Sequence, residues 1–232
     1  MSAPATPRLG WALYAATVTV HLGFQLVAPD QLGSRVSQIL LAPILLALLL
    51  RSVDARNQHL GNWTMAALQF CFLGDLLPGV VGGDAGFLAM VGAFLGAQVC
   101  FCVAFWPYRA ASFLGARRGW LLGYAAALAA LMVVVGPDAG ALIGPVVVYG
   151  LTLTLMAVLA SGLGPLGAWG GALFLVSDAL VAIRAFTLDV PASGVVVMMT
   201  YAAALGLLVL AVVRRSNEAG TTSARAEHPR HR

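Results

Sequence analysis

Long apolar runs alternate with short polar segments along almost the whole chain. Each run has about 15–23 residues, close to the roughly 20 residues with which an α-helix crosses a hydrocarbon core of about 30 Å. The pattern predicts eight transmembrane helices: Gly10–Ala28, Val36–Leu50, Asn62–Val81, Gly86–Trp106, Gly119–Val135, Ala141–Ala160, Gly164–Phe186 and Ser193–Val213.

The predicted fold class is therefore an all-α integral membrane protein. A transmembrane barrel would show alternating strands of about ten residues, and that pattern does not occur in the sequence. The first run is longer than the apolar region of about 7–15 residues in a secretory signal, so we interpret it as a membrane helix. Residues 1–213 are predicted to form a single transmembrane domain, and residues 214–232 a disordered, basic, cytoplasmic tail.

Charge predicts the orientation. All 13 basic residues are arginines, and if the helices alternate in direction most of them fall on the side of the two termini. The positive-inside rule then places both termini in the cytoplasm. The five tryptophans fall at the same helix ends, as an interfacial aromatic belt does. The net charge of +4 thus indicates topology and contact with the membrane, and we predict no nucleic-acid partner. The expected location is a bacterial plasma membrane.

A faint internal repeat suggests two halves of four helices. A shift of about 103 positions brings Asp75 onto Asp178 and Gln98 onto Tyr201. Four helices followed by four would give repeats of the same orientation, a known membrane architecture. Because apolar sequences match one another easily by chance, the 4+4 repeat is a hypothesis.

Small residues at helical spacing predict two close helix contacts. Gly92 and Gly96 are four residues apart, as are Gly167 and Gly171. This spacing allows two membrane helices to approach closely.

Five polar residues on five predicted helices share one depth. Counted from the non-cytoplasmic ends at about 1.5 Å per residue, Asp75, Asp178, Tyr149 and Tyr201 lie about 10–13 Å deep and Gln98 about 18 Å. An ionised Asp at the bilayer centre costs about 2.5–3.5 kcal/mol on insertion scales. Such residues usually face a bundle interior or a wet cavity, so Asp75 and Asp178 are the predicted functional pair.

Other polar residues have simpler interpretations. We expect His21 and Gln25 to form hydrogen bonds between helices, and a contribution to the site is the alternative. Thr152, Thr154 and Thr200 are expected to bond back to their own helices. Arg184 lies six positions from Asp178 on a different face, near enough to the helix end to extend to the interface.

Two carboxyl groups close together in a low dielectric do not ionise together easily, so one can hold a proton near neutral pH. Acid-catalysed cleavage of ethers and acetals needs this arrangement, with one carboxyl to protonate and one carboxylate to stabilise an oxocarbenium ion or activate water. We predict no metal and no cofactor, because Cys100 and Cys102 are two positions apart and no ligand cluster accompanies them.

Several motifs resemble the YhhN-like lysoplasmalogenase family of eight-helix membrane proteins. They are Phe70-Cys71-Phe72-Leu73-Gly74-Asp75, Gly92-Ala93-Phe94-Leu95, Tyr149 through Met156-Ala157, Gly171 through Ser177-Asp178, and Thr200-Tyr201-Ala202-Ala203-Ala204. The resemblance implies a hydrolase that cleaves the vinyl-ether bond of lysoplasmalogens to a fatty aldehyde and a glycerophospho-base. It implies Asp75 and Asp178 as catalytic residues, and we add Tyr149, Tyr201, Gln98 and Ser177 as substrate-binding candidates.

The chain departs from the family pattern at Gln98, Phe101, Leu205 and Cys71, where relatives commonly have His, Tyr, Gln and Ser. Gln98 does not titrate, so a proton role of that His would be lost. Two rival hypotheses follow. Buried Asp pairs also serve proton- or cation-coupled transporters, and the departures fit a lipid-binding member without activity.

Overall fold

The computed structural model describes residues 6–29, 31–52, 58–187 and 193–227. These residues form helices and no strand. The α-helices are α1 (Thr6–Val27), α2 (Leu32–Ser52), α3 (Gln58–Val81), α4 (Gly83–Phe105), α5 (Gly119–Val135), α6 (Ile143–Ala160), α7 (Pro165–Phe186) and α8 (Ser193–Glu227). Single 3₁₀ turns follow α4 and α6 and precede α6: η2 (Trp106–Tyr108), η4 (Ser161–Leu163) and η3 (Gly140–Leu142).

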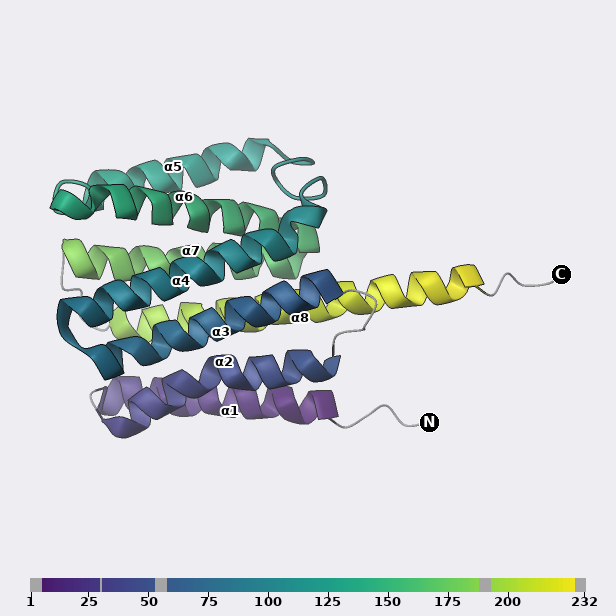
Figure 1. The fold of residues 1–232 in the computed structure, drawn as a ribbon, viewed down its shortest axis with the longest axis horizontal. Helices are drawn as coiled ribbons and strands as arrows, with labels where there is room; N and C mark the ends of the chain where they lie inside the picture. The colour runs from purple at the N-terminus through teal and green to yellow at the C-terminus, as the bar shows by residue number, and fades with distance from the viewer. Residues whose placement is uncertain (1–5, 30, 53–57, 188–192, 228–232) are drawn as a thin grey trace.

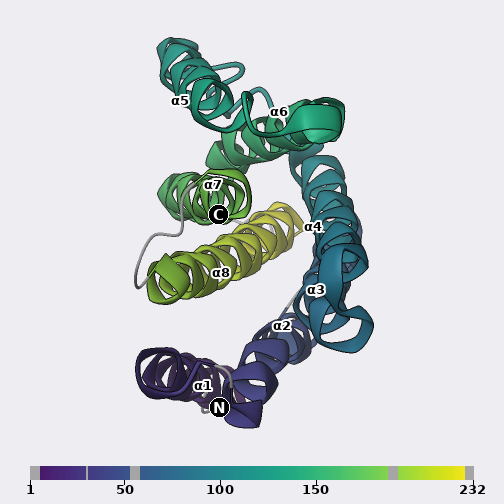
Figure 2. The same cartoon turned by 90° about the vertical axis from the view of Figure 1, so that its left-hand side faces the viewer.

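Successive helices run in opposite directions, so both termini lie at one end of the bundle (Figure 1). The last residues of α1, α3, α5 and α7 lie at the opposite end. Viewed from that end, α3 and α4 lie side by side and face α7 and α8 (Figure 2). The α1–α2 pair closes one edge of this central group, and α6, with α5 outside it, closes the other.

Six of the described helices are long and apolar enough to cross a membrane: α2, α3, α4 with η2, α6 with its flanking turns, α7 and α8. The helix α5 is apolar but shorter, and most of its side chains are exposed. The chain is thus a helical multi-pass membrane protein. Each of the eight predicted runs coincides with one of these α-helices to within two residues wherever it extends past the helix, and α5 has the predicted bounds.

The last helix does not end where its apolar run ends. The sequence predicts an end at Val213 and disorder beyond it, whereas α8 continues to Glu227. Polar side chains do not stop a helix that is already nucleated, and Arg215 pairs with Glu218 across one turn at 3.4 Å. The Arg215 guanidinium also lies 5.1 Å from the ring centre of Tyr108, the last residue of η2. Residues 228–232 of the predicted tail lie outside the described residues.

Glycines with positive φ permit the one-residue turn between α3 and α4. Gly82 and Gly83, between α3 and α4, have φ values of 72° and 54°, a conformation that L side chains rarely adopt. The turn places α3 and α4 in extensive contact, and each contributes a glycine over which a ring of the other packs. The Phe94 ring covers Gly74, and the Phe70 ring covers Gly96.

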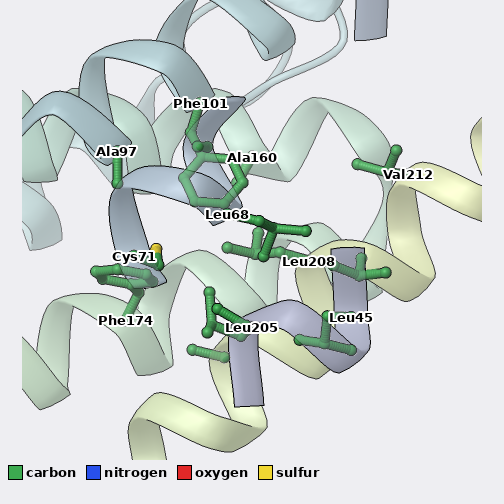
Figure 3. Packing of buried hydrophobic residues seen from close by; sticks show 14 of the residues in the cluster. Leu45, Leu68, Cys71, Ala97, Phe101, Ala160, Phe174, Leu205, Leu208 and Val212 are labelled. Carbon is green, nitrogen blue, oxygen red and sulfur yellow. The ribbon is translucent and has the colours of Figure 1, made fainter. Parts of the chain in front are cut away.

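The apolar core fills the half of the bundle near the termini. The rings of Phe101 and Phe174 meet edge to face at 6.4 Å, and both are fully buried. Leu205 and Leu208 of α8 pack beside them, with Cys71 of α3 near Phe174 (Figure 3). Three of the positions that depart from the family pattern, Phe101, Leu205 and Cys71, therefore lie in the apolar core.

The predicted close contact at Gly167 and Gly171 is confirmed, and that at Gly92 and Gly96 is confirmed only at Gly96, over which the Phe70 ring packs. A Cβ on Gly171 would lie 2.8 Å from the Ala157 backbone of α6. A Cβ on Gly92 would meet nothing within 4 Å. Abundant Gly in an apolar sequence matches the small-residue spacing on faces that have no neighbour as well as on faces that have one.

We predict that Gly171→Ala lowers the stability of the fold, because the α6 backbone cannot move away from the added methyl group without separating the helices. Overpacking of this kind costs about 1–3 kcal/mol. Thermal unfolding of the purified protein in detergent measures the effect. Gly92→Ala is the matched control and should unfold like wild type; equal stability of the two variants would contradict the packing described here.

Candidate functional site

A cavity of about 630 Å³ occupies the half of the bundle opposite the core. Most of its wall is apolar, formed by side chains of α4, α5, α6 and α8 such as Leu88, Val91, Leu131, Val146 and Met198. Both intramembrane carboxylates line it, Asp75 from α3 and Asp178 from α7. The arrangement combines a hydrocarbon-lined space with two acidic groups.

Asp75 is held by donors from two other helices. The Gln38 amide of α2 donates from Nε2 to Asp75 Oδ1 at 2.9 Å. The Tyr201 hydroxyl of α8 donates to Asp75 Oδ2 at 2.9 Å. Each carboxylate oxygen of Asp75 therefore has a donor. The residue is only 9% exposed, so little of it faces the cavity.

Asp178 is held differently. The Tyr149 hydroxyl of α6 donates to Asp178 Oδ2 at 2.6 Å, and the Gln98 amide of α4 donates from Nε2 to the same oxygen at 3.1 Å. Within the described part of the chain, no hydrogen bond reaches Asp178 Oδ1. Asp178 is also more exposed than Asp75. One oxygen of this carboxyl group is thus available to a molecule in the cavity.

The two carboxylates receive matching donor sets, each with one Gln amide and one Tyr hydroxyl. Asp75, on the third helix, is bound from the second and the eighth. Asp178, on the seventh helix, is bound from the sixth and the fourth. Each acid therefore takes one donor from the preceding helix of its own half and one from the last helix of the other half.

Three of the four predicted substrate-binding residues contact the carboxylates: Tyr149, Tyr201 and Gln98. Gln98 is fully buried, and its Oε1 has no partner among the described residues. Ser177 also lines the cavity, but its hydroxyl donates to the Val197 carbonyl of α8 at 3.1 Å. It ties α7 to α8 beside the acid, and its contact with a substrate stays a prediction.

Sequence reasoning missed Gln38 and underestimated Arg184. Gln38 stands near the start of an otherwise apolar predicted helix, and one polar side chain at an interfacial helix end carries little information. Arg184 lines the cavity although it lies on a different face of α7 from Asp178, and its guanidinium lies beside Gly194 at the start of α8. With the predicted start at Val36, Gln38 would lie only about 3 Å deep, whereas α2 begins four residues earlier, at Leu32.

The simpler interpretations of the remaining polar residues are confirmed. His21 Nδ1 lies 3.1 Å from the Ser34 carbonyl and 3.0 Å from the Ser37 hydroxyl, linking α1 to α2. Gln25 Nε2 lies 3.4 Å from Ser34 Oγ, and Gln25 also lines the cavity. Thr152, Thr154 and Thr200 bond to carbonyls of their own helices. Within the described residues, no group of three or more His, Cys, Asp or Glu lies close enough to hold a metal ion.

We predict that Tyr201→Phe lowers the stability of the protein by about 1–3 kcal/mol, because a buried carboxylate oxygen loses its donor. The ring contacts of Tyr201 with Phe94 and Phe174, at 5.7 Å and 5.9 Å, are kept by phenylalanine. Thermal unfolding in detergent provides the measurement. Tyr124→Phe on α5 removes a hydroxyl that does not bind a carboxylate; if the two variants were equally stable, the Asp75 contact would not contribute.

Comparison with known proteins identifies the family of this chain. The model of the YhhN family matches residues 34–212, a range that contains both carboxylates and their four donors. A lysoplasmalogenase of Rattus norvegicus, TMEM86B, is 40% identical over 70 residues. That match spans about 30% of the length of each protein. No solved structure matches the chain. Because the family model covers most of the sequence, this chain belongs to the YhhN family.

Proposed function

We propose that this protein hydrolyses the vinyl-ether bond of lysoplasmalogen-type lipids within the membrane, with Asp75 and Asp178 as the catalytic pair. The observation that carries the proposal is the presence of both carboxylates on the wall of one hydrocarbon-lined cavity. Membership of the YhhN family and the partial match to a lysoplasmalogenase support it.

Asp178 is the acid in this proposal. Its Oδ1 has no described partner and is open to the cavity, whereas Asp75 has a donor on each oxygen. A proton on Asp178 Oδ1 can pass to the second alkenyl carbon of the lipid, which leaves an oxocarbenium ion at the carbon that bears the ether oxygen. Protonation by a positioned side chain typically accelerates such a step about 10²–10⁴-fold.

Water completes the reaction. It adds to the oxocarbenium carbon and gives up a proton to the carboxylate that Asp178 has become. The resulting hemiacetal breaks its bond to the glycerol oxygen, which receives the proton that Asp178 took from the water and leaves as a hydroxyl group. The hemiacetal hydroxyl loses its own proton to Asp178, which is thereby restored to the acid form, and the chain leaves as a saturated aldehyde. Asp75 remains a carboxylate near the cationic intermediate, held by Gln38 and Tyr201.

Gln98 fits this scheme as a positioning residue. Its amide and the Tyr149 hydroxyl meet on Asp178 Oδ2, which directs the other oxygen toward the cavity. A residue that does not titrate is sufficient for this role. The departure from His therefore affects the donor set of Asp178 and leaves both acids in place.

The transporter hypothesis has less support. A carrier needs access to its site from both ends of the bundle, and the half near the termini is filled by fully buried Phe101, Phe174, Leu205 and Leu208. The third hypothesis, a lipid-binding family member without activity, is distinguished from the hydrolase by an assay for aldehyde release.

We expect Asp178→Asn to reduce aldehyde release from lysoplasmalogen by about 10²–10⁴-fold, because Asn cannot supply the proton. Aldehyde release by Asp75→Asn should also fall sharply, since the carboxylate that stabilises the cation is lost. Purified protein and a chemical assay for the fatty aldehyde provide the measurement. Asp84→Asn, an exposed acid at the start of α4, should keep wild-type rates. Unchanged rates in either site variant would rule out the mechanism.

We further propose the orientation and symmetry of the fold: eight membrane-crossing helices in two halves of four, with both termini in the cytoplasm of a bacterium. Each acid has one donor from its own half and one from the last helix of the other half, and this symmetry supports the repeat. The common end of the two termini, rich in Arg and Trp, supports the orientation.

A reporter fused after residue 232 tests the orientation. Green fluorescent protein should fluoresce there, and a phosphatase that needs periplasmic export should be inactive. The reverse result would place the termini outside the cytoplasm.

A further inference from the structure

We propose that Arg184 binds the phosphate of the lipid substrate at the mouth of the cavity and thereby sets the depth at which the ether bond lies. This inference rests on the proposed function and adds the part of the site that recognises the polar end of the lipid. Arg184 belongs to the last turn of α7, and among the described residues that line the cavity it is the one with a positive charge.

The guanidinium has room and no competing partner among the described residues. No ion pair of Arg184 with a described residue is present, and the side chain is exposed. A Cβ on Gly194 of α8 would lie 3.5 Å from Arg184 Nη1 and 3.2 Å from Gln25 Oε1. The absence of a side chain at Gly194 therefore lets the Arg184 and Gln25 side chains, from α7 and α1, lie next to the start of α8.

The chemistry of this end of the cavity suits a phosphodiester. Arg presents several N–H donors in a planar fork that matches phosphate oxygens. Gln25 carries an amide beside it, and Gly194 and Val195, in the first turn of α8, line the same space. The first N–H groups of a helix have no carbonyl partner within the helix and attract anions.

The spacing matches the substrate. Arg184 and Asp178 are six residues apart on α7, which corresponds to about 9 Å along the helix axis. In a lysoplasmalogen the glycerol backbone and the ether oxygen separate the phosphorus from the alkenyl carbon that is protonated. At ordinary bond lengths that path is about 8 Å when extended. A phosphate on Arg184 thus places the alkenyl carbon at the depth of Asp178, and the hydrocarbon chain follows the apolar wall.

Two substrates isolate the contribution of Arg184. One is a lysoplasmenylethanolamine, which carries the phosphate, and the other is a 1-O-alkenylglycerol, which lacks it. We expect Arg184→Gln to lower kcat/KM for the phospholipid about 10- to 100-fold, which corresponds to the loss of a charged hydrogen bond. Its kcat/KM for the alkenylglycerol should equal that of wild type. Arg184→Lys should restore part of the affinity.

Arg35→Gln is the matched control. Arg35 lies in the first turn of α2 at the same end of the bundle, near Gly79 of α3, and it does not line the cavity. This variant should leave both substrates unaffected. If Arg184→Gln changed neither substrate while wild type hydrolysed both, the inference would be overturned and the proposed function would stand.

A binding measurement separates the two proposals. A 1-O-alkyl lysophosphatidylethanolamine has no vinyl ether, and it should raise the melting temperature of wild type and not that of Arg184→Gln. The same shift in a wild-type protein without any turnover would support the phosphate site and contradict the hydrolase. An equal, Arg184-dependent shift with inorganic phosphate or glycerophosphoethanolamine alone would show a site for free phosphate and overturn the lipid assignment.

Discussion

Two carboxylates buried among apolar helices are stable only if hydrogen-bond donors meet them, and the donors determine which helices must pack together. Asp75 joins α3 to α2 and α8, and Asp178 joins α7 to α6 and α4. Each acid is thus a junction of three helices, including one from the other half of the chain. Because the donors are neutral Gln and Tyr side chains, they hold the acids without forming ion pairs that would neutralise them.

The two acids lie between a packed core and a cavity. Fully buried Phe101, Phe174 and Leu208 fill the half near the termini, and the cavity occupies the half near the helix connections. The acids and their donors lie where the core ends. A lipid that enters from the open half would meet Arg184 first, the carboxylates next and the closed core beyond them. The closed core suits a reaction on a bound lipid better than passage through the bundle.

The sequence predicted the helices well, because runs of this length and composition have few other folds. It also predicted that polar residues of different helices lie at one level, since helical rise converts position into height along the bundle, and their hydrogen bonds agree with this. It could not predict which donor meets which acid, because that depends on helix rotation and on contacts between distant segments. Gln38 was missed for this reason, and the reach of Arg184 into the cavity required the positions of α1 and α8.

The positions that depart from the family pattern also show that the sequence does not reveal helix rotation. In the sequence, Leu205, Phe101 and Cys71 stand out as changes near the expected site. In the structure they are fully buried in the core, and only Gln98 touches an acid. Propensity and spacing do not distinguish a residue that faces the cavity from one a turn away that packs against a neighbouring helix. The same ambiguity explains why α8 was expected to end with its apolar run, although helix propagation extends it to Glu227.

Cross-linking of the two acid positions tests the central claim most directly. Cys71, Cys100 and Cys102 would be replaced by alanine, and Asp75 and Asp178 by cysteine. The account predicts that a short bifunctional thiol reagent joins the two cysteines within one chain, and that a chain with cysteine at positions 84 and 178 is not joined. Efficient single labelling at 75 and 178 without any link between them would show that the two acids do not share a cavity.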